Sequence, residues 1–422
     1  MFGIAVAIGG TLGAGILRQP GPIASYLRFP WLIMLVWLAG AFYAALGVTN
    51  VSELATMIPR AGGFYVFARE ALGDTAAFTV GWSDFLANAA PVAYGGIVAA
   101  EFAGHVFPGI RPFATVLAVG AILAFAVTQW FGIRISARVQ QTASAITAVA
   151  LVGLVAACFT VGTPTGFAQV PPLPSGVGLG AAMVLAIQSI IVTYDGWYEP
   201  IYFAEDARHP TRQLPRAMFG GLALVAAIYL LLNAALLHAL GPSGLAASKF
   251  AAADAAARVF GSAGNAVVSA IGVTIMLTLM STVLMSATRI LFAVSRDGLF
   301  WSRAGWVAAN GTPRTALALS TLVIVAMVLS GTVDRLIALA GFFYVFNYSS
   351  AYLSLMVLRR KRPAAERPFR VPGYPLTTLV ILVSCLAFLV GAVASDRENS
   401  LWALLLLLAS IPIRLLLRKT VN

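Results

Sequence analysis

Long apolar stretches recur along the whole chain, and short polar segments separate them. Most run for about 18 residues or more, which is enough to cross a hydrocarbon core of about 30 Å as a helix. The run at residues 401–408 is apolar on every face, whereas a barrel strand would alternate apolar and polar positions. Because lipid admits only helices or closed barrels, the pattern predicts an all-α integral membrane protein. About twelve spans are expected, at residues 1–26, 30–58, 78–105, 112–131, 141–161, 177–203, 217–240, 265–293, 315–330, 334–358, 376–394 and 401–417.

Composition and charge support a membrane protein and orient it. Of the 422 residues, 60% are hydrophobic and 10% are charged, which leaves too little polar surface for a soluble domain. The net charge of +12 lies in short loops, so it indicates topology rather than a nucleic-acid partner. With the N-terminus in the cytoplasm, about 19 basic residues fall on the cytoplasmic side and about 7 outside. We expect a multi-pass protein in the lipid of the cell (inner) membrane, with both termini cytoplasmic.

Residues suited to metal or covalent chemistry are scattered. Cys158 and Cys385 both lie inside apolar runs, so neither a disulfide framework nor a metal-ligand spacing is present. His105, His209 and His238 are far apart in the sequence, and no nucleophile and base can be paired. We expect no metal, no cofactor, no enzymatic activity, no nucleic-acid partner and no disulfide-linked subunit.

Two of the expected spans are interrupted by residues that helices in lipid disfavour. The first span contains GGTLGAG at residues 9–15, and the sixth contains TYDGWYEP at residues 193–200. Glycine costs about 1 kcal/mol per residue in a helix interior, although closely spaced glycines also mark helix packing. Spans one and six each open a set of five. Broken helices at such matching positions leave free backbone N–H and C=O groups near the bilayer midplane, so they predict the binding site of a transporter.

The two breaks suit a substrate that carries both charges. The positive end of a helix dipole stabilises a carboxylate and the negative end stabilises an ammonium group, so an α-amino acid matches the pair. We expect the amides of Gly13, Ala14 and Gly15 to face the carboxylate. Carbonyl groups near residues 8–10 and 191–194 would then receive the ammonium group.

Side chains at the second break admit more than one role. Asp195 is costly in the membrane and is a proton site, a substrate contact or the cap of a half-helix that begins at Gly196; we favour the cap. Trp197 and Tyr198 are candidates for an aromatic lid over the site, Trp197 the better one, although aromatic residues in membrane proteins more often simply pack. Arg18, toward the outer end of the first span, is expected to extend to the membrane interface; its candidate partners in a gating role are Asp84, Glu101 and Glu199.

Several short motifs, taken in order, resemble those of a known family. They are IGGTLGAGILRQPG at residues 8–21, PRAGGFY at 59–65, YDGW at 194–197, PTRQLPR at 210–216 and SRDG at 295–298. On these motifs the chain resembles the amino acid, polyamine and organocation (APC) permease superfamily, and within it bacterial relatives of the L-type amino acid transporters.

This resemblance implies a LeuT-type fold and transport by alternating access, with helices one and six broken. Two inverted repeats of five helices would occupy residues 1–162 and 177–358, and residues 359–422 would hold a cytoplasmic basic loop and two further helices. By position, the resemblance implies substrate contacts at Thr11, Gly13, Ala14, Gly15, Val192, Tyr194 and Gly196, with Trp197 nearby.

Two positions, Thr147 and Val192, depart from the family's pattern, and a hydroxyl pair in span eight bears on the coupling ion. Thr147 stands where the family often has a lysine in helix five, so sodium-independent exchange does not simply follow. Ser281 and Thr282 form a hydroxyl pair of the kind that contributes to a cation site, although such hydroxyls more often bond their own backbone. Val192 replaces a gating phenylalanine, which predicts a wider side-chain pocket.

The expected function is secondary active transport of amino acids, and neutral L-amino acids moved by exchange or by proton symport fit it best. Three alternatives stay open. One is a sodium-coupled symporter that uses Ser281 and Thr282, and another is a carrier of polyamines or organic cations that uses Asp195 and Glu199. A non-transporting amino acid sensor is the least favoured, because the cytoplasmic loops are short.

Overall fold

The computed structural model describes residues 2–13, 15–27, 29–161 and 179–421, and those residues fold into helices without any strand. Ala14 and part of the expected sixth span, residues 177–178, lie outside the described residues. The elements of the first half are α1 (Phe2–Thr11), α2 (Gly15–Arg18), α3 (Pro20–Tyr26), α4 (Pro30–Met57), α5 (Phe64–Leu72), α6 (Asp74–Val106), η1 (Pro108–Phe113), α7 (Ala114–Trp130) and α8 (Ile133–Val161).

The second half continues the all-helical architecture. Its elements are α9 (Leu179–Thr193), η2 (Glu199–Asp206), α10 (Pro210–Ala247), α11 (Ala251–Phe260), η3 (Gly261–Ala263), α12 (Gly264–Arg296), η4 (Ser302–Gly305), α13 (Arg314–Ser330), α14 (Val333–Lys361), α15 (Leu376–Ser395) and α16 (Arg397–Val421).

Nine helices within the described residues are long and apolar enough to cross a membrane. Three expected spans are not among them. The first and sixth are broken into shorter helices, and the ninth is the 17-residue α13. The fold class is therefore confirmed as an all-α membrane protein, while the count of twelve spans stays a prediction.

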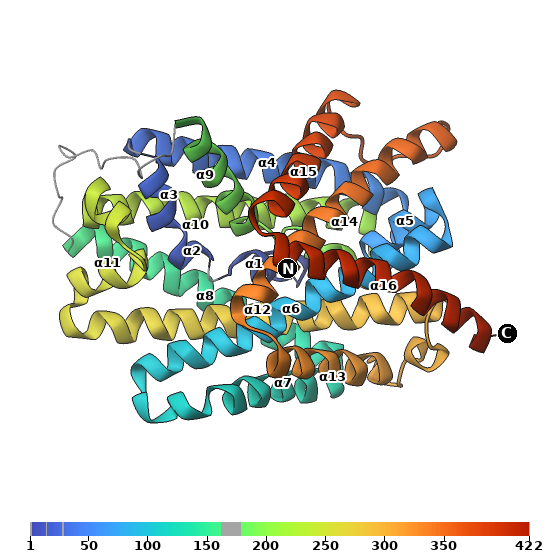
Figure 1. Ribbon diagram of the computed structural model, residues 1–422, viewed down its shortest axis with the longest axis horizontal. Coiled ribbons are helices and arrows are strands. Elements are labelled where there is room, and N and C mark those ends of the chain that lie inside the picture. The colour runs from blue at the N-terminus through green and yellow to red at the C-terminus, as the bar shows by residue number, and fades with distance from the viewer. Residues whose placement is uncertain (1, 14, 28, 162–178, 422) are drawn as a thin grey trace.

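The long helices run side by side along the long axis of the molecule (Figure 1). α5 and the C-terminus lie at one end, called the α5 end below, and α3 and α11 lie at the opposite end, called the α11 end. The central helix α6 packs most extensively against α12 and is 83% buried over its apolar window, whereas the peripheral α7 is 11% buried. Apolar side chains on the outer helices are thus left to face lipid.

Both predicted interruptions are present. α1 ends at Thr11 and the chain resumes as α2 at Gly15, while α9 ends at Thr193 and a turn leads into η2 at Glu199. Gly196 lies in this turn with φ +100°, a backbone conformation that side-chain-bearing residues rarely adopt. The glycine therefore allows the second break, and Pro200 in the first turn of η2 keeps α9 from continuing.

Candidate functional site

The two breaks touch each other through their backbones. A Cβ atom added at Gly196 would collide with the carbonyl group of Gly10, and one added at Gly10 would collide with Glu199. The hydroxyl of Tyr229 on α10 lies 2.8 Å from the carbonyl oxygen of Thr11 and 3.2 Å from that of Thr193, and it is the donor to both. The last residues of α1 and α9 are thereby fastened to one side chain.

A cavity of about 210 Å³ lies beside this junction. That volume is below the range of about 300 to 1,000 Å³ usual for drug-sized ligands, so it suits a solute of a few heavy atoms. The lining comes from both breaks and from α6, α12 and α14: Gly10, Thr11, Gly13, Gly15, Arg18, Gln19, Tyr94, Val98, Val192, Thr193, Asp195, Leu279, Ile337, Ala340, Gly341 and Tyr344.

This cavity opens away from the α5 end. Its exposed lining residues are Arg18 on α2, Val192 on α9 and Ile337 near the start of α14. α14 runs from there to Lys361, whose Nζ donates to the carbonyl oxygen of Ala71 on α5 at 3.0 Å. The opening therefore lies on the α11 side of the junction.

The predicted site residues divide into two groups around the cavity. Thr11, Gly13, Gly15, Val192 and Asp195 line it. The others lie behind the lining: Tyr194 and Trp197 are buried against other aromatic rings, and Gly196 is buried against Gly10; Ala14 lies outside the described residues.

Asp195 does not cap a helix, and that interpretation was wrong. η2 begins after Tyr198 with no side-chain cap. The carboxyl of Asp195 instead accepts hydrogen bonds from the hydroxyls of Tyr348 and Tyr198, the second at 3.4 Å. Tyr348, which binds the Asp195 carboxyl in place of a helix N-terminus, lies on α14, 153 residues later in the sequence.

Trp197 lies behind the lining of the cavity, not over the cavity as a lid. Its side chain is 4% exposed and stacks on the ring of Tyr348, with ring centroids 5.6 Å apart and an interplanar angle of 18°. A Cβ added at Gly47 on α4 would lie 2.6 Å from the Trp197 ring, so the indole fills the space above that glycine. The residue packs helix six against α4 and α14.

Several cavity residues escaped the sequence analysis because they lie on unbroken helices. Periodicity alone does not fix which face of a uniformly apolar helix turns inward. The structure assigns these positions to Tyr94 and Val98 on α6, Leu279 on α12, and Ala340, Gly341 and Tyr344 on α14.

Of the hydroxyl pair on α12, Thr282 is engaged with its own helix. Thr282 Oγ1 donates to the carbonyl oxygen of Thr278 at 3.1 Å and lies near Gly9 of the first break. Ser281 is buried, and its carbonyl oxygen accepts from Gln129 Nε2 at 3.3 Å. Thr147 shares a hydrogen bond of 3.0 Å with the hydroxyl of Thr278. Across the described ranges, no three histidine, cysteine or acidic side chains gather as metal ligands do.

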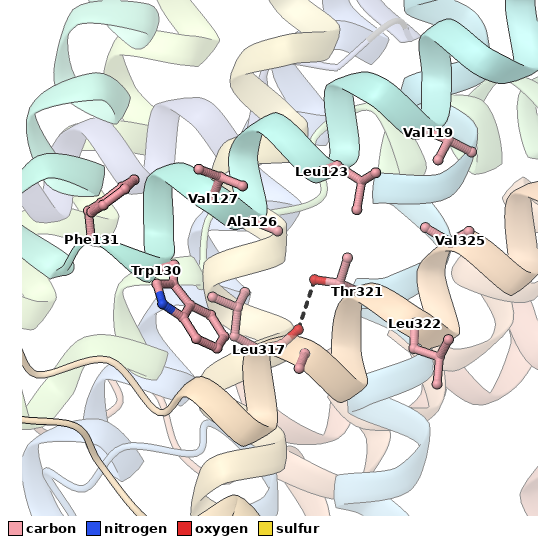
Figure 2. A pocket seen from close by; sticks show the side chains of 11 residues that line it. Val119, Leu123, Ala126, Val127, Trp130, Phe131, Leu317, Thr321, Leu322 and Val325 are labelled. Atoms are coloured by element: carbon pink, nitrogen blue, oxygen red, sulfur yellow. Dashed lines mark hydrogen bonds between the residues drawn. The ribbon is translucent and has the colours of Figure 1, made fainter.

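A larger groove lies elsewhere, between α7 and α13 (Figure 2). Its volume is about 580 Å³, and apolar side chains such as Leu123, Val127 and Leu322 line it. The one lining hydroxyl, on Thr321, is spent on the carbonyl oxygen of Leu317 at 2.8 Å. With no convergent polar groups, the groove suits lipid chains rather than a polar solute.

The α5 end is closed by charged side chains that cross between elements. Asp297, which follows α12, pairs with Arg60 at 3.0 Å and with Arg69 of α5 at 2.7 Å, and Tyr65 donates to it at 3.0 Å. These contacts join the segment after α4 to the end of α12. They lie beyond the junction on the side away from the cavity opening.

Two further ion pairs tie η2 to α12. Arg296 donates to both carboxylate oxygens of Glu205, at 2.9 and 3.0 Å, and Arg289 pairs with Asp206 at 2.8 Å. Burial alone would raise the pKa of the Glu205 carboxyl, but hydrogen bonds from Arg296 and from the backbone of Ala61 hold that pKa below its ordinary value. The second half of broken helix six is thus anchored at the α5 end.

Comparisons with known proteins agree with this geometry. A family model described as amino acid permease matches residues 3–411. The serine/threonine exchanger SteT of Bacillus subtilis is 25% identical over 419 residues, covering 98% of this chain and 94% of the relative. The b(0,+)-type amino acid transporter 1 of Mus musculus is 27% identical over 423 residues, covering 97% and 85%. The Asc-type amino acid transporter 1 of Mus musculus is 26% identical over 427 residues, covering 97% and 78%.

Proposed function

The chain belongs to the amino acid permease family, and we propose that it is a secondary active transporter of neutral L-amino acids. Its relatives are named as transporters and exchangers of amino acids, not as enzymes. The observation that carries the proposal is the junction itself: two broken helices, fastened together by Tyr229, border a small cavity.

The chemistry of the junction supports a zwitterionic substrate. α2 begins at Gly15, and the first amides of a helix have no acceptor inside the helix, so they are available to a carboxylate. α9 ends at Val192 and Thr193, whose carbonyl oxygens each accept one hydrogen bond, from the Asp195 N–H and from the Tyr229 hydroxyl, and each keeps a second lone pair for an ammonium group. The site would therefore use Thr11, Gly13, Ala14, Gly15, Val192 and Asp195 at the substrate, with Tyr194, Gly196 and Trp197 shaping it from behind.

The lining also argues for a neutral substrate over a polyamine. Among the described lining residues, Asp195 is the one carboxyl, and Arg18 brings a positive charge to the same cavity. Glu199, the second acid that a polyamine carrier would need, is buried below and accepts a hydrogen bond from Ser286. A sodium-coupled mode through Ser281 and Thr282 has no comparable support, because the hydroxyl of Thr282 is bonded to its own helix.

Alternating access explains the asymmetry of the two ends. In this proposal the α5 end, where Arg60, Arg69 and the basic residues after α14 gather, is cytoplasmic in the inner membrane. Ion pairs close that end while the cavity opens at the other, so the conformation is outward-open. The inverted repeats at residues 1–162 and 177–358 would rock against each other, and both termini would be cytoplasmic. Both cysteines are buried, so the proposal includes no disulfide-linked subunit.

A binding screen tests the substrate class. The detergent-purified protein is heated with each of the twenty L-amino acids, with putrescine and with spermidine, in sodium and in potassium buffers. A ligand at 100 times its Kd stabilises the folded state by about 2.7 kcal/mol, so binding raises the Tm. We expect a subset of neutral amino acids to stabilise in both buffers; stabilisation by polyamines alone would contradict the proposal.

A substitution at the first break tests the site. Gly15→Leu places a side chain in the cavity, where a Cβ already lies 3.2 Å from Thr193 Oγ1. We expect uptake and ligand-induced stabilisation to fall at least tenfold while the protein stays folded and inserted. The matched control is Gly120→Leu on the exposed face of α7, where nothing lies within 4 Å of an added Cβ. Normal uptake by Gly15→Leu would remove the site from the first break.

A further inference from the structure

A second polar cluster lies in the membrane core outside the cavity, around Asp84 on α6. The residue is fully buried. Its Oδ1 accepts hydrogen bonds from the Tyr202 hydroxyl at 2.7 Å, from Asn88 Nδ2 at 3.2 Å and from Asn347 Nδ2 at 3.4 Å. The cluster therefore joins α6, η2 and α14.

The other oxygen of the same carboxyl is left without a donor. Asp84 Oδ2 is buried and accepts no hydrogen bond within the described residues, although the backbone amide of Phe64 faces the carboxyl group. Asn88 Oδ1, one turn away on α6, is also buried and unpaired. Exchanging the oxygen and nitrogen of the Asn88 amide would not remove the unpaired acceptor, because Nδ2 in its present position already donates to Asp84. Two orphaned acceptors in one cluster mark the place of a missing hydrogen.

No positive charge balances Asp84. The groups facing it are Ser83, whose hydroxyl is 2.6 Å from Asn347 Oδ1, the phenol of Tyr344 on α14, and the acids Glu199 and Asp195, besides the amides and the tyrosine already named. In the described part of the chain, no lysine, arginine or histidine forms an ion pair with any of these three acids. An unpaired carboxylate at this depth is strongly disfavoured, whereas a protonated one is neutral and brings its own donor.

Asp84 differs from the other two buried acids in this respect. Both carboxylate oxygens of Asp195 accept from tyrosine hydroxyls, and Glu199 accepts from Ser286. Of the three, only Asp84 has a carboxylate oxygen that is buried without a partner. Of the three acids, Asp84 is therefore the one whose unpaired oxygen can carry a proton without losing a hydrogen bond.

η2 connects this acid to both ends of the transport path. Tyr198 bonds Asp195 in the cavity wall, and its ring packs against that of Tyr202, with centroids 6.1 Å apart. Tyr202 donates to Asp84, and Glu205, three residues further on, holds the ion pair with Arg296 at the α5 end. Tyr202 and Glu205 lie on the same short element, so a movement of η2 away from Arg296 would also move Tyr202 away from Asp84.

We propose that Asp84 carries the proton of a proton–amino acid symport, taking it up while the cavity is open and releasing it when the α5 end opens. The inference rests on the proposed function. The proton forms an O–H bond at Asp84 Oδ2, that bond breaks on release, and one proton crosses with each substrate without any redox change.

The test uses purified full-length protein in liposomes with L-[³H]serine as the probe, and two assays separate coupling from transport. Counterflow at equal pH, with unlabelled L-serine inside, reports substrate exchange. Accumulation into serine-free vesicles at pH 7.5 inside and pH 6.0 outside reports coupling, with a trapped fluorescent dye recording proton entry. We expect wild type to perform both, with proton entry on serine addition that a protonophore masks.

Asp84→Asn is the variant and Asp74→Asn is its control, because Asp74 is an exposed acid on the same helix. We expect Asp84→Asn to keep counterflow within about threefold of wild type, to lose gradient-driven accumulation at least tenfold and to admit no protons, and Asp84→Glu to restore part of the coupling. Asp74→Asn should behave as wild type.

Three outcomes would overturn the proposal. Wild-type counterflow without proton entry would refute the coupling and leave the proposed function standing. Full accumulation by Asp84→Asn, or accumulation driven by a sodium gradient instead, would remove the role of Asp84. Absence of counterflow in wild type, with serine and with every other L-amino acid in turn, would refute the proposed function and the coupling with it. Proton entry is measured with the wild-type protein, so the coupling is still tested if Asp84→Asn fails to fold.

Discussion

Glu53 on α4 and Asp84 on α6 are both fully buried acids, but they have opposite surroundings. Arg359 donates to the two carboxylate oxygens of Glu53 at 2.7 and 2.6 Å, Arg367 lies 3.2 Å away, and the backbone N–H of Val371 donates at 2.7 Å. Asp84 receives only hydroxyl and amide donors and keeps one oxygen unpaired.

The difference teaches how burial assigns a charge state. Glu53 is paired with two cations, and it fastens the basic loop after α14 to the end of α4. A buried charge with fixed partners has a structural role, because it is costly to remove a partner. Asp84 has no such partners, so a proton is the neutralising group available to it, and a proton can leave. The predictions below probe this contrast.

The largest effect is expected at Glu53. Glu53→Gln leaves the guanidinium groups of Arg359 and Arg367 without a counter-charge in a buried place, which costs about 3 to 5 kcal/mol. The free energy of unfolding, measured in mixed micelles with increasing dodecyl sulfate, should fall by that amount. Glu70→Gln, which breaks the more exposed pair with Arg362, is the control and should cost less than about 1 kcal/mol.

Asp84→Asn belongs in the same assay, since it makes the same chemical change at the second buried acid. An amide that replaces a neutral acid keeps most hydrogen bonds, so we expect a loss of about 1 kcal/mol or less. If Asp84→Asn were as damaging as Glu53→Gln, the contrast between the two acids would collapse.

An intermediate effect is expected from Tyr202→Phe, which removes the shortest hydrogen bond to Asp84. A hydrogen bond to a neutral group contributes about 0.5 to 1.5 kcal/mol, and one to a charged group about 1.5 to 3 kcal/mol. We expect a loss of unfolding free energy of about 1 kcal/mol, as for a neutral acid. Tyr43→Phe, which loses only a 3.4 Å contact with the Cys385 thiol, serves as the control. A loss near 3 kcal/mol would indicate an ionised Asp84.

The smallest effect is expected at the exposed pair of Glu205 and Arg296. The pKa of Glu205 lies below its ordinary value of 4.5 in the folded protein, so the pair stabilises the fold above that pH. This contribution is lost as the pH falls through the lowered pKa. Because both side chains are about a third exposed, it amounts to about 0.5 kcal/mol. Stability of Glu205→Gln should therefore lack a small acid-dependent component that wild type shows below pH 4.5.

The sequence predicted the parts of this molecule that depend on local pattern. Apolar runs indicated membrane helices, and the glycines and proline at residues 9–15 and 193–200 marked both breaks. Thr11, Gly15 and Val192 were predicted as site residues because they stand at those breaks, and all three line the cavity. Each of the three was predicted from residues that lie next to it in the chain.

Contacts between segments that are distant in the chain could not be predicted from the sequence. Asp195 was interpreted as a cap, since nothing local announced Tyr348, which comes 153 residues later. Asp84 was considered only as a partner for Arg18, which instead approaches Glu101 at 4.0 Å; the Tyr202 hydroxyl is 118 residues from Asp84 in sequence. Uniformly apolar helices such as α6 and α14 give no sign of which side turns inward, so Tyr94 and Tyr344 were missed.

Counterflow of amino acids into wild-type proteoliposomes tests the central claim most directly. Vesicles loaded with unlabelled substrate are supplied in turn with each of the twenty radiolabelled L-amino acids, and initial rates are compared with those of protein-free vesicles. The account predicts saturable, protein-dependent uptake of a subset of small neutral amino acids. Uptake that never exceeds the protein-free leak for any of them would contradict it.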